Sequence, residues 1–236
     1  MHATPFPRPI GRVLVTGGGS GLGAAVADAI AAAGGTPAIV DLQLGHAGGR
    51  YASRIADVSD RVQVEQAVGE LADELGGLDA VVTAAGIDRC GRLDAIDPTE
   101  WERVIGVNLL GTVSTVRAAL PFLERVHGRV ITVASSLALR ALPEATAYCA
   151  SKFGVLGFSR ALAAECAGRL GVTTLIPAGM RTGFFDDRPE AYRPAPDAQL
   201  NDPADVARAV VFALQQPRGC EVRELVICPE AEPSWP

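Results

Sequence analysis

Short, strongly apolar runs alternate along the chain with longer segments of helical composition. The short runs predict strands at residues 12–16, 37–40, 54–56, 79–83, 129–134, 172–176 and 222–227. The longer segments predict helices over residues 24–33, 59 to about 75, 98 to about 125, 147 to about 170 and 203 to about 215. Strands that alternate with helices predict a parallel sheet covered by helices on both faces, in one α/β domain over residues 1–236.

Local signals refine three of these helices. Ser59 is the predicted N-cap of the second helix, and Pro203 stands in the first turn of the last one. The helix that begins at Pro98 is expected to bend near Gly111 and Pro121. Irregular loops are expected at residues 42–51 and 181–202, and a short tail at 1–10.

The composition is that of an ordinary globular protein. Hydrophobic residues make up 48% of the chain and charged residues 20%, which excludes general disorder. The formal net charge of -6, without a basic stripe, argues against nucleic acid and against an anionic membrane surface as partners. No apolar stretch reaches the length of a membrane span.

Cysteine and histidine usage predicts neither disulfides nor a metal site. The five cysteines are scattered without a C-x-x-C pair, as in reduced cytosolic proteins, and the proline-punctuated N-terminus does not resemble a signal peptide. We therefore expect a cytoplasmic protein. Three histidines, His2, His46 and His127, are too far apart for metal-ligand spacing, so no metal is expected.

A glycine-rich segment, T-G-G-G-S-G-L-G at residues 16–23, lies between the first strand and the first helix. Glycines there let the backbone approach a pyrophosphate at the helix N-terminus, although a plain strand-to-helix turn has the same composition. Asp41 ends the second strand, where a carboxylate can accept from ribose hydroxyls and repel a 2′-phosphate. The pattern favours NAD over NADP, and the alternative is that Asp41 is a solvated acid.

Tyr148 and Lys152 are four residues apart on the predicted helix 147–170, so both side chains lie on one face. Lys152 is the sole lysine, because the other twenty basic residues are arginines. A neighbouring cation lowers the pKa of a phenol, which predicts an acid/base role for Tyr148. Ser135 and Ser136 end the fifth strand at the ligand edge of the sheet. Alternatively, these are a surface tyrosine–lysine pair and two turn serines.

In chain order, the sequence carries TGGGSGLG, Asp41, Asp57-Val58, Ala84-Ala85-Gly86, Asn108, Ser135 and Tyr148-x-x-x-Lys152. On this ordered set, residues 12–228 resemble the short-chain dehydrogenase/reductase family. The resemblance implies a doubly wound Rossmann fold with seven parallel strands in the order 3-2-1-4-5-6-7. It also implies a homodimer or homotetramer.

The resemblance implies hydride transfer between NAD(H) and a small-molecule secondary alcohol or ketone. Tyr148 is then the general acid/base, Lys152 holds the nicotinamide ribose, Ser135 orients the substrate, and Asn108 holds a water for proton relay. The implied NAD-binding residues are Gly17, Gly19, Ser20, Gly21, Leu22, Gly23, Asp41, Leu42, Asp57, Val58, Ala84, Ala85, Gly86, Tyr148, Lys152, Pro177, Ala178, Met180 and Thr182. Alternatives are an NADP-using ketoreductase, a non-catalytic dinucleotide-binding regulator on the same fold, and a non-redox enzyme that uses NAD transiently.

Several departures from the family pattern affect this picture. Ala84 replaces an asparagine that braces the sheet, the helix between Asp41 and Asp57 is reduced to a turn at most, and the substrate lid at 181–202 is short. The family's frequent C-terminal D-G-G is missing, which leaves the tetramer open. The candidate pocket walls, mostly apolar, favour a substrate with a ring or acyl chain: Ile87, Arg89, Leu137, Leu142, Pro143, Met180, Phe184 and Phe185. Arg89 or Arg140 could pair with a charged substrate group, although exposure to solvent is the more common outcome.

Overall fold

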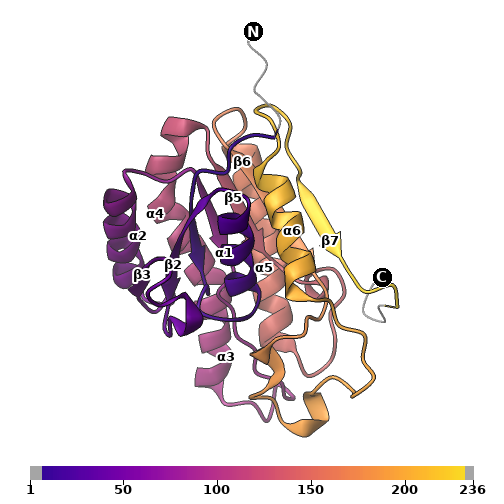
Figure 1. Cartoon of the computed structure of the whole chain (residues 1–236). Coiled ribbons are helices and arrows are strands. Elements are labelled where there is room, and N and C mark those ends of the chain that lie inside the picture. Colours follow the sequence, from indigo (N-terminus) through magenta and orange to yellow (C-terminus); the bar gives the residue numbers. More distant parts are fainter. Residues whose placement is uncertain (1–6, 232–236) are drawn as a thin grey trace.

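The computed structural model describes residues 7–231 of the chain, so residues 1–6 of the expected N-terminal tail lie outside it. Seven parallel strands form one sheet in the order β3-β2-β1-β4-β5-β6-β7, which confirms the predicted topology (Figure 1). The strands are β1 (Arg12–Thr16), β2 (Thr36–Asp41), β3 (Ala52–Ile55), β4 (Ala80–Thr83), β5 (Arg129–Val133), β6 (Gly171–Pro177) and β7 (Glu224–Ile227).

Helices cover both faces of the sheet. They are α1 (Gly21–Ala32), α2 (Arg61–Leu75), α3 (Pro98–Ile105), α4 (Gly111–Val126), α5 (Thr146–Glu165) and α6 (Pro203–Leu214). The alternation of side chains along β1 divides the core. Leu14 packs with the helices α2, α4 and α5, whereas Val13 and Val15 face the opposite side and pack with α1 and α6.

Asp60, and not Ser59, is the N-cap of α2. The Asp60 carboxylate accepts from the backbone N–H groups of Val62 and Gln63 at 2.9 and 3.2 Å. The Ser59 hydroxyl instead donates to Asp57 at 2.7 Å. Both residues are good caps by composition, and the turn that follows β3 decides between them. The predicted helix start is therefore wrong by one position.

The expected bend after α3 is a π-helical turn over Gly106–Leu110, followed directly by α4. Pro121, the other expected break, lies inside α4. Within the described residues, the continuous run 98–126 is long and apolar enough to cross a membrane by length and composition. Val104, Val116 and Leu123 of this run are buried in the protein, which accounts for its apolar character. The turn also carries Asn108.

The connections at the carboxyl end of the sheet are short, as expected. Between β2 and β3 the chain forms a single 3-10 turn, Gly45–Ala47, in place of a helix. α5 ends at Glu165, five residues before the predicted end, and the following strand begins at Gly171. Parallel strands end at one edge of the sheet, so the loop after β2 and the lid border one space, whereas the connection between α5 and β6 lies at the opposite edge.

Candidate active site

A cavity of about 1070 Å³ opens at the carboxyl ends of the strands. Its walls come from the glycine-rich loop, the ends of β2 to β6, the start of α5 and the lid. Nearly all of the predicted site residues line it: Gly17, Ser20, Gly21, Leu22, Gly23, Asp41, Leu42, Asp57, Val58, Ala84, Ala85, Gly86, Ser135, Tyr148, Lys152, Pro177, Ala178, Met180 and Thr182. Gly19 and Asn108 do not line the cavity; each supports a residue that does.

The glycine-rich loop leaves no room for side chains where it turns into α1. A Cβ on Gly23 would lie 2.1 Å from the carbonyl oxygen of Gly17, and a Cβ on Gly17 would lie 2.6 Å from the backbone nitrogen of Ala85. Gly17 and Gly21 also have left-handed backbones, with φ of 72° and 52°. The start of α1 therefore presents backbone N–H groups to the cavity, which suits a pyrophosphate.

Asp41 is part of this loop structure and not a merely solvated acid. Its carboxylate accepts from the N–H of Gly19 at 2.8 Å and from the N–H of Gln43 at 3.1 Å. A Cβ on Gly19 would lie 1.9 Å from the carbonyl oxygen of Gln43, so the two loops are in direct contact. Asp41 thereby holds the glycine-rich loop against the end of β2 while one side of the residue borders the cavity.

Lys152 is buried, with 5% of its surface exposed, and its ammonium donates to the carbonyl oxygen of Val133 at 2.9 Å. Its nitrogen lies 5.6 Å from the centre of the Tyr148 ring. Burial lowers the pKa of Lys152 to about 8, against a smaller opposing effect of Asp88. The ammonium is thus fixed below the tyrosine ring by a backbone oxygen at the end of β5.

The tyrosine differs from the sequence-based expectation. Burial raises the pKa of Tyr148 to about 12, and this outweighs the hydrogen bond with Ser135, which favours the phenolate. The expected lowering of the Tyr148 pKa by Lys152 is therefore wrong for this structure, because the ammonium points toward Val133 while desolvation dominates at the phenol. In this state the Tyr148 hydroxyl carries its proton at neutral pH.

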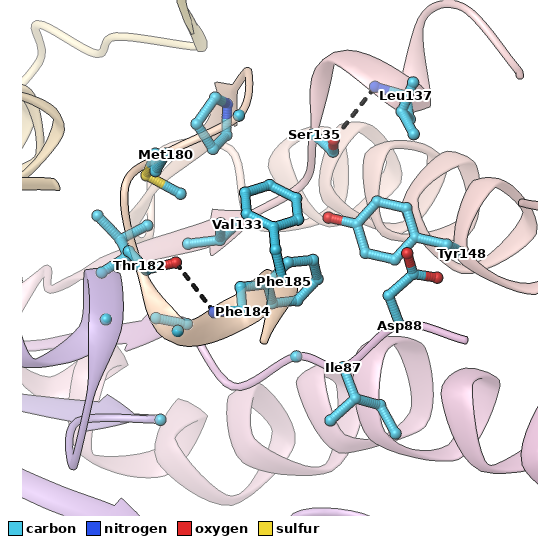
Figure 2. A pocket seen from close by; sticks show the side chains of 18 of the residues that line it. Ile87, Asp88, Val133, Ser135, Leu137, Tyr148, Met180, Thr182, Phe184 and Phe185 are labelled. Carbon is cyan, nitrogen blue, oxygen red and sulfur yellow. Dashed lines mark hydrogen bonds between the residues drawn. The ribbon is translucent and has the colours of Figure 1, made fainter. Parts of the chain in front are cut away.

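Ser135 lies just beyond the carboxyl end of β5, and the Tyr148 hydroxyl points toward it (Figure 2). Its oxygen also accepts from the N–H of Leu137 at 3.2 Å, which orients the side chain. Ser136, the other serine at the strand end, begins a 3-10 turn (Ser136–Ala138) and is buried. The arrangement favours Ser135 as the partner of a substrate oxygen, because it is the serine that is coupled to the tyrosine.

Asn108 is fully buried in the π-helical turn. Its side-chain amide donates to the carbonyl oxygen of Ile87 at 2.9 Å and to the Ser151 hydroxyl at 3.0 Å. Its oxygen accepts from the N–H of Ile87 at 2.8 Å. The side chain therefore ties the loop after β4 to α5, beside Gly86, where Lys152 also lies. The water relay through Asn108 stays a prediction.

The lid forms the outer wall of the cavity. The Thr182 hydroxyl accepts from the N–H of Phe184 and so begins the 3-10 turn Gly183–Phe185. The Phe184 ring meets the Tyr148 ring edge to face at 5.8 Å, and Phe185 meets Phe184 at 5.5 Å. The predicted pocket walls line the cavity with one exception: Pro143 lies instead in a shallow surface depression.

Five charged residues of the cavity are not among the predicted ones: Asp88, Arg103, Asp187, Arg188 and Asp197. Asp88, just after the A-A-G segment, forms an ion pair with Arg188 of the lid. Arg89, a candidate ligand for a charged substrate group, instead pairs with Glu100 at 2.6 Å, and Arg140 does not line the cavity. The position of Asp88 in the loop that follows β4 and the A-A-G segment is a usable signal for it. Nothing in the sequence pointed to Arg188.

The chain matches the family model described as short chain dehydrogenase over residues 11–193. Over 217 residues it is 36% identical to a D-threitol dehydrogenase from Mycolicibacterium smegmatis, and the alignment covers 84% of each protein. It is also 34% identical to a glycine betaine reductase from Emericella nidulans, over 98% of this chain but only 20% of that longer protein.

Solved structures of similar fold are also dehydrogenases and reductases. An alcohol dehydrogenase from the archaeon Thermococcus sibiricus, complexed with 5-hydroxy-NADP, superposes with a TM-score of 0.83 at 26% identity, covering 91% of this chain and 94% of that one. A 3-ketoacyl-(acyl-carrier-protein) reductase from Brucella melitensis, complexed with NADH, gives a TM-score of 0.81 at 27% identity, covering 92% and 96%. Structures of this shape therefore occur with either type of nicotinamide cofactor.

Proposed function

Because the chain belongs to the short-chain dehydrogenase family, we propose that it transfers a hydride between NAD(H) and a secondary alcohol or ketone. The observation that carries this proposal is the convergence of Ser135, Tyr148 and Lys152 on one cavity that also contains the glycine-rich loop. A site that only bound a dinucleotide would need the loop but not a protonated phenol coupled to a serine. This argues against the non-catalytic alternative.

The residues fit a dinucleotide. Gly17 and Gly23 have no room for a Cβ, so the loop turns tightly into α1 and exposes its backbone, and Asp41 stands at the adjacent strand end. The pyrophosphate would lie on residues 17–23, the adenosine near Asp41, Asp57 and Val58, and the nicotinamide against Pro177, Met180 and Thr182. The nicotinamide, when bound, supplies or accepts the hydride.

The chain itself supplies proton transfer and orientation. In the direction of ketone reduction, the Tyr148 hydroxyl holds the proton that the carbonyl oxygen needs, and its raised pKa keeps that proton in place at neutral pH. Ser135 donates a hydrogen bond to the same oxygen and fixes its position. Lys152, whose ammonium is anchored on the carbonyl oxygen of Val133, would hold the ribose hydroxyls. The phenylalanines of the lid exclude water from the reacting atoms.

Asp41 supports NAD as the cofactor over NADP. Its carboxylate is fixed by two backbone N–H groups, and residues 16–23 contain no Lys or Arg that could bind a 2′-phosphate. A phosphate placed there would meet a negative charge held in position. The NADP-using ketoreductase remains the alternative that the cofactor comparison below tests.

The substrate is a small molecule, and the assembly is a homodimer or homotetramer of a cytoplasmic protein. Two large apolar side chains are exposed where α5 adjoins the π-helical turn, Phe153 at 45% and Leu110 at 55%. They support pairing of the α4 and α5 helices between two copies. Phe212 and Val226, exposed on α6 and β7, support a second contact. No disulfide forms among the described cysteines, which suits a reducing compartment.

The experiment is a panel of secondary alcohols and ketones followed at the nicotinamide absorbance, with NAD(H) and NADP(H) in parallel. We expect turnover of at least one panel member, with kcat/KM for NAD(H) at least about tenfold higher than for NADP(H). Turnover with neither cofactor across the panel would contradict the proposal. If the enzyme prefers NADP(H), the hydride-transfer proposal stands, but Asp41 does not select NAD.

A further inference from the structure

Asp88 and Arg188 form a buried ion pair between the body of the protein and the lid. Asp88 lies in the loop after β4, and Arg188 lies in the lid, 100 residues further along the chain. The Asp88 Oδ2 and Arg188 Nη2 atoms are 2.5 Å apart, and 2% and 16% of the two side chains are exposed. Solvent screens a buried pair only weakly, so this contact holds the two segments together more strongly than a surface ion pair would.

On the body side, hydrogen bonds fix the loop that carries Asp88. The Asn108 side chain bonds to both the N–H and the carbonyl oxygen of Ile87, at 2.8 and 2.9 Å. The carbonyl oxygen of Asp88 accepts from Arg89 Nη1 at 2.8 Å, and Arg89 pairs with Glu100 of α3. The Asp88 carboxylate therefore projects from a backbone that is held on both sides, and it gives the lid a fixed point of attachment.

On the lid side, Arg188 holds the outer part of the lid together. Its guanidinium lies over the two phenylalanine rings of the lid, 4.6 and 5.4 Å from their centres, and its Nη1 donates to the Tyr192 carbonyl oxygen at 3.2 Å. The Phe184 ring in turn meets the Tyr148 ring edge to face at 5.8 Å. Figure 2 shows the Asp88 carboxylate beside the same tyrosine. A chain of contacts thus runs from the loop after β4 through the lid to the catalytic tyrosine.

The base of the lid is attached separately from its outer part. The N–H of Arg181 donates to the carbonyl oxygen of Asn201 at 2.9 Å, and the N–H of Asn201 donates to the carbonyl oxygen of Gly179 at 3.0 Å. These backbone bonds hold the two ends of the lid side by side, next to the residues proposed to contact the nicotinamide. Loss of the ion pair would therefore release the outer lid and leave its base in place.

The pair is bonded through one atom of each charged group. Within the part of the chain that the structure describes, the buried Asp88 Oδ1 and Arg188 Nε atoms have no hydrogen-bond partner. Buried polar atoms without a partner destabilise the state that buries them, and they regain hydrogen bonds to water when that state opens. The closed lid is thus held by one strong contact and opposed by two unsatisfied atoms. This balance suits a contact that breaks and re-forms as substrate enters and product leaves.

We propose that Asp88 and Arg188 are positioning residues, whose ion pair is a latch that closes the lid over the reacting hydroxyl of Tyr148. This rests on the function proposed above. The closed latch holds Phe184 against the tyrosine ring, which completes the apolar outer wall of the substrate site and keeps water from the reacting atoms. The catalytic serine and lysine are oriented by their own bonds at the end of β5. The latch therefore governs substrate binding more than the chemical step.

The test is a double-mutant cycle of Asp88→Leu, Arg188→Met and the double variant, on the best substrate of the panel, with thermal unfolding as the check on folding. We expect KM for the substrate to rise by at least about tenfold in each variant, with kcat within about threefold of wild type. The Kd for NADH should not change, because the base of the lid stays attached.

The double variant removes both charges together, so it leaves no unpaired buried charge that could unfold the protein. It also removes together two opposing effects on the pKa of Tyr148, which Asp88 raises and Arg188 lowers. Its KM should match that of the single variants and not the product of their effects, because all three variants break the same contact.

Limited digestion with chymotrypsin, which cleaves after aromatic residues, measures opening of the lid without any substrate. The lid offers Phe184, Phe185 and Tyr192 as cleavage sites. We expect the three latch variants to be cut there at least about tenfold faster than wild type. Arg181→Met in the lid and Asp94→Leu in the loop after β4 are matched controls, because they remove exposed charges that do not line the cavity. Both should keep the wild-type KM and cleavage rate.

Either a wild-type KM in all three latch variants or a wild-type rate of lid cleavage in all three would overturn the inference and leave the proposed function standing. If wild type turns over no alcohol or ketone with either cofactor, the proposed function fails. The cleavage rates still decide in that case whether the ion pair holds the lid closed.

Discussion

The ammonium nitrogen of Lys152 donates to the backbone oxygen of Val133 at 2.9 Å. This bond places a compact cation at the end of β5, under the ring of Tyr148. A guanidinium is planar and larger, so it cannot occupy the same buried position without displacing the tyrosine or the backbone. The single lysine of the chain thus stands where arginine is a poor substitute.

We predict that Lys152→Arg lowers kcat/KM by about 100-fold or more although the charge is retained. Steady-state rates at saturating cofactor would measure this, with thermal unfolding to show that the variant is folded. Arg160→Lys is the matched control on the same helix, because Arg160 is exposed and pairs with Glu224 at the surface. Full activity of Lys152→Arg would contradict the role of this residue.

The buried lysine makes stability depend on pH in a defined direction. Burial lowers the Lys152 pKa from 10.5 to about 8, so between these values the unfolded chain binds the proton more tightly than the folded one. The free energy of unfolding therefore rises with pH across this window, and the penalty of burying the charge applies in full below pH 8. The gain is about 3 kcal/mol at most, from 1.36 kcal/mol per pKa unit.

Urea unfolding of wild type and Lys152→Met at pH 7.5 and at pH 10 would measure this effect. We expect wild type to gain stability relative to Lys152→Met as the pH rises. Tyr148 is present in both proteins, so its own titration cancels to first order. A relative loss for wild type over the same interval would show that the lysine is stabilised in its charged form.

We assign two functions to Asp41: its carboxylate braces the glycine-rich loop, and its charge repels a 2′-phosphate. Substitutions can separate these two functions. Asp41→Asn keeps an oxygen that can accept from the N–H of Gly19 but removes the charge, whereas Asp41→Ala removes both. We predict that both variants shift the ratio of kcat/KM for NAD over NADP toward NADP by about tenfold or more, since repulsion of the 2′-phosphate is lost. Asp41→Ala should also weaken binding of both cofactors. An unchanged ratio in both variants would mean that Asp41 does not select the cofactor.

Gly23→Ala tests the glycine-rich loop. The added Cβ would lie 2.1 Å from the Gly17 carbonyl oxygen, so the loop must shift and cofactor binding should be lost. Gly69→Ala is the matched control in α2, where an added Cβ has no neighbour within 4 Å. It should leave cofactor affinity unchanged and stabilise the helix by about 0.5–1 kcal/mol. Isothermal titration with NADH compares the two, and equal affinities would contradict the assigned role of the loop.

The sequence predicted the sheet well because parallel strands buried on both faces are read as apolar runs. The order of all seven strands, which the family resemblance implies, is confirmed. The ends of helices were less predictable. Ser59 and Asp60 are both suitable caps, and only the turn after β3 decides between them. The π-helical turn at Gly106–Leu110 was expected as a bend, but its hydrogen bonding depends on the packing of Asn108 against Ile87 and Ser151.

The cavity was predictable where motifs name its residues, and unpredictable where it depends on long-range contacts. The Asp88–Arg188 pair joins positions 100 residues apart, and no periodicity or spacing connects them. The pKa of Tyr148 depends on burial, which a motif does not specify, so its direction was predicted wrongly. The i, i+4 relation of Tyr148 and Lys152 could be predicted from the sequence, because the helix alone places the two side chains on one face.

The most direct test of the central claim is the comparison of wild type with Tyr148→Phe on the best substrate of the panel, with cofactor binding measured in parallel. We predict that Tyr148→Phe binds NADH as wild type does, because the glycine-rich loop that binds the cofactor does not depend on the hydroxyl. We also predict that kcat falls by about 100-fold to 10,000-fold, because the proton donor is lost. Wild-type kcat in Tyr148→Phe across the panel would contradict the claim that Tyr148 is the general acid/base of a hydride-transferring enzyme.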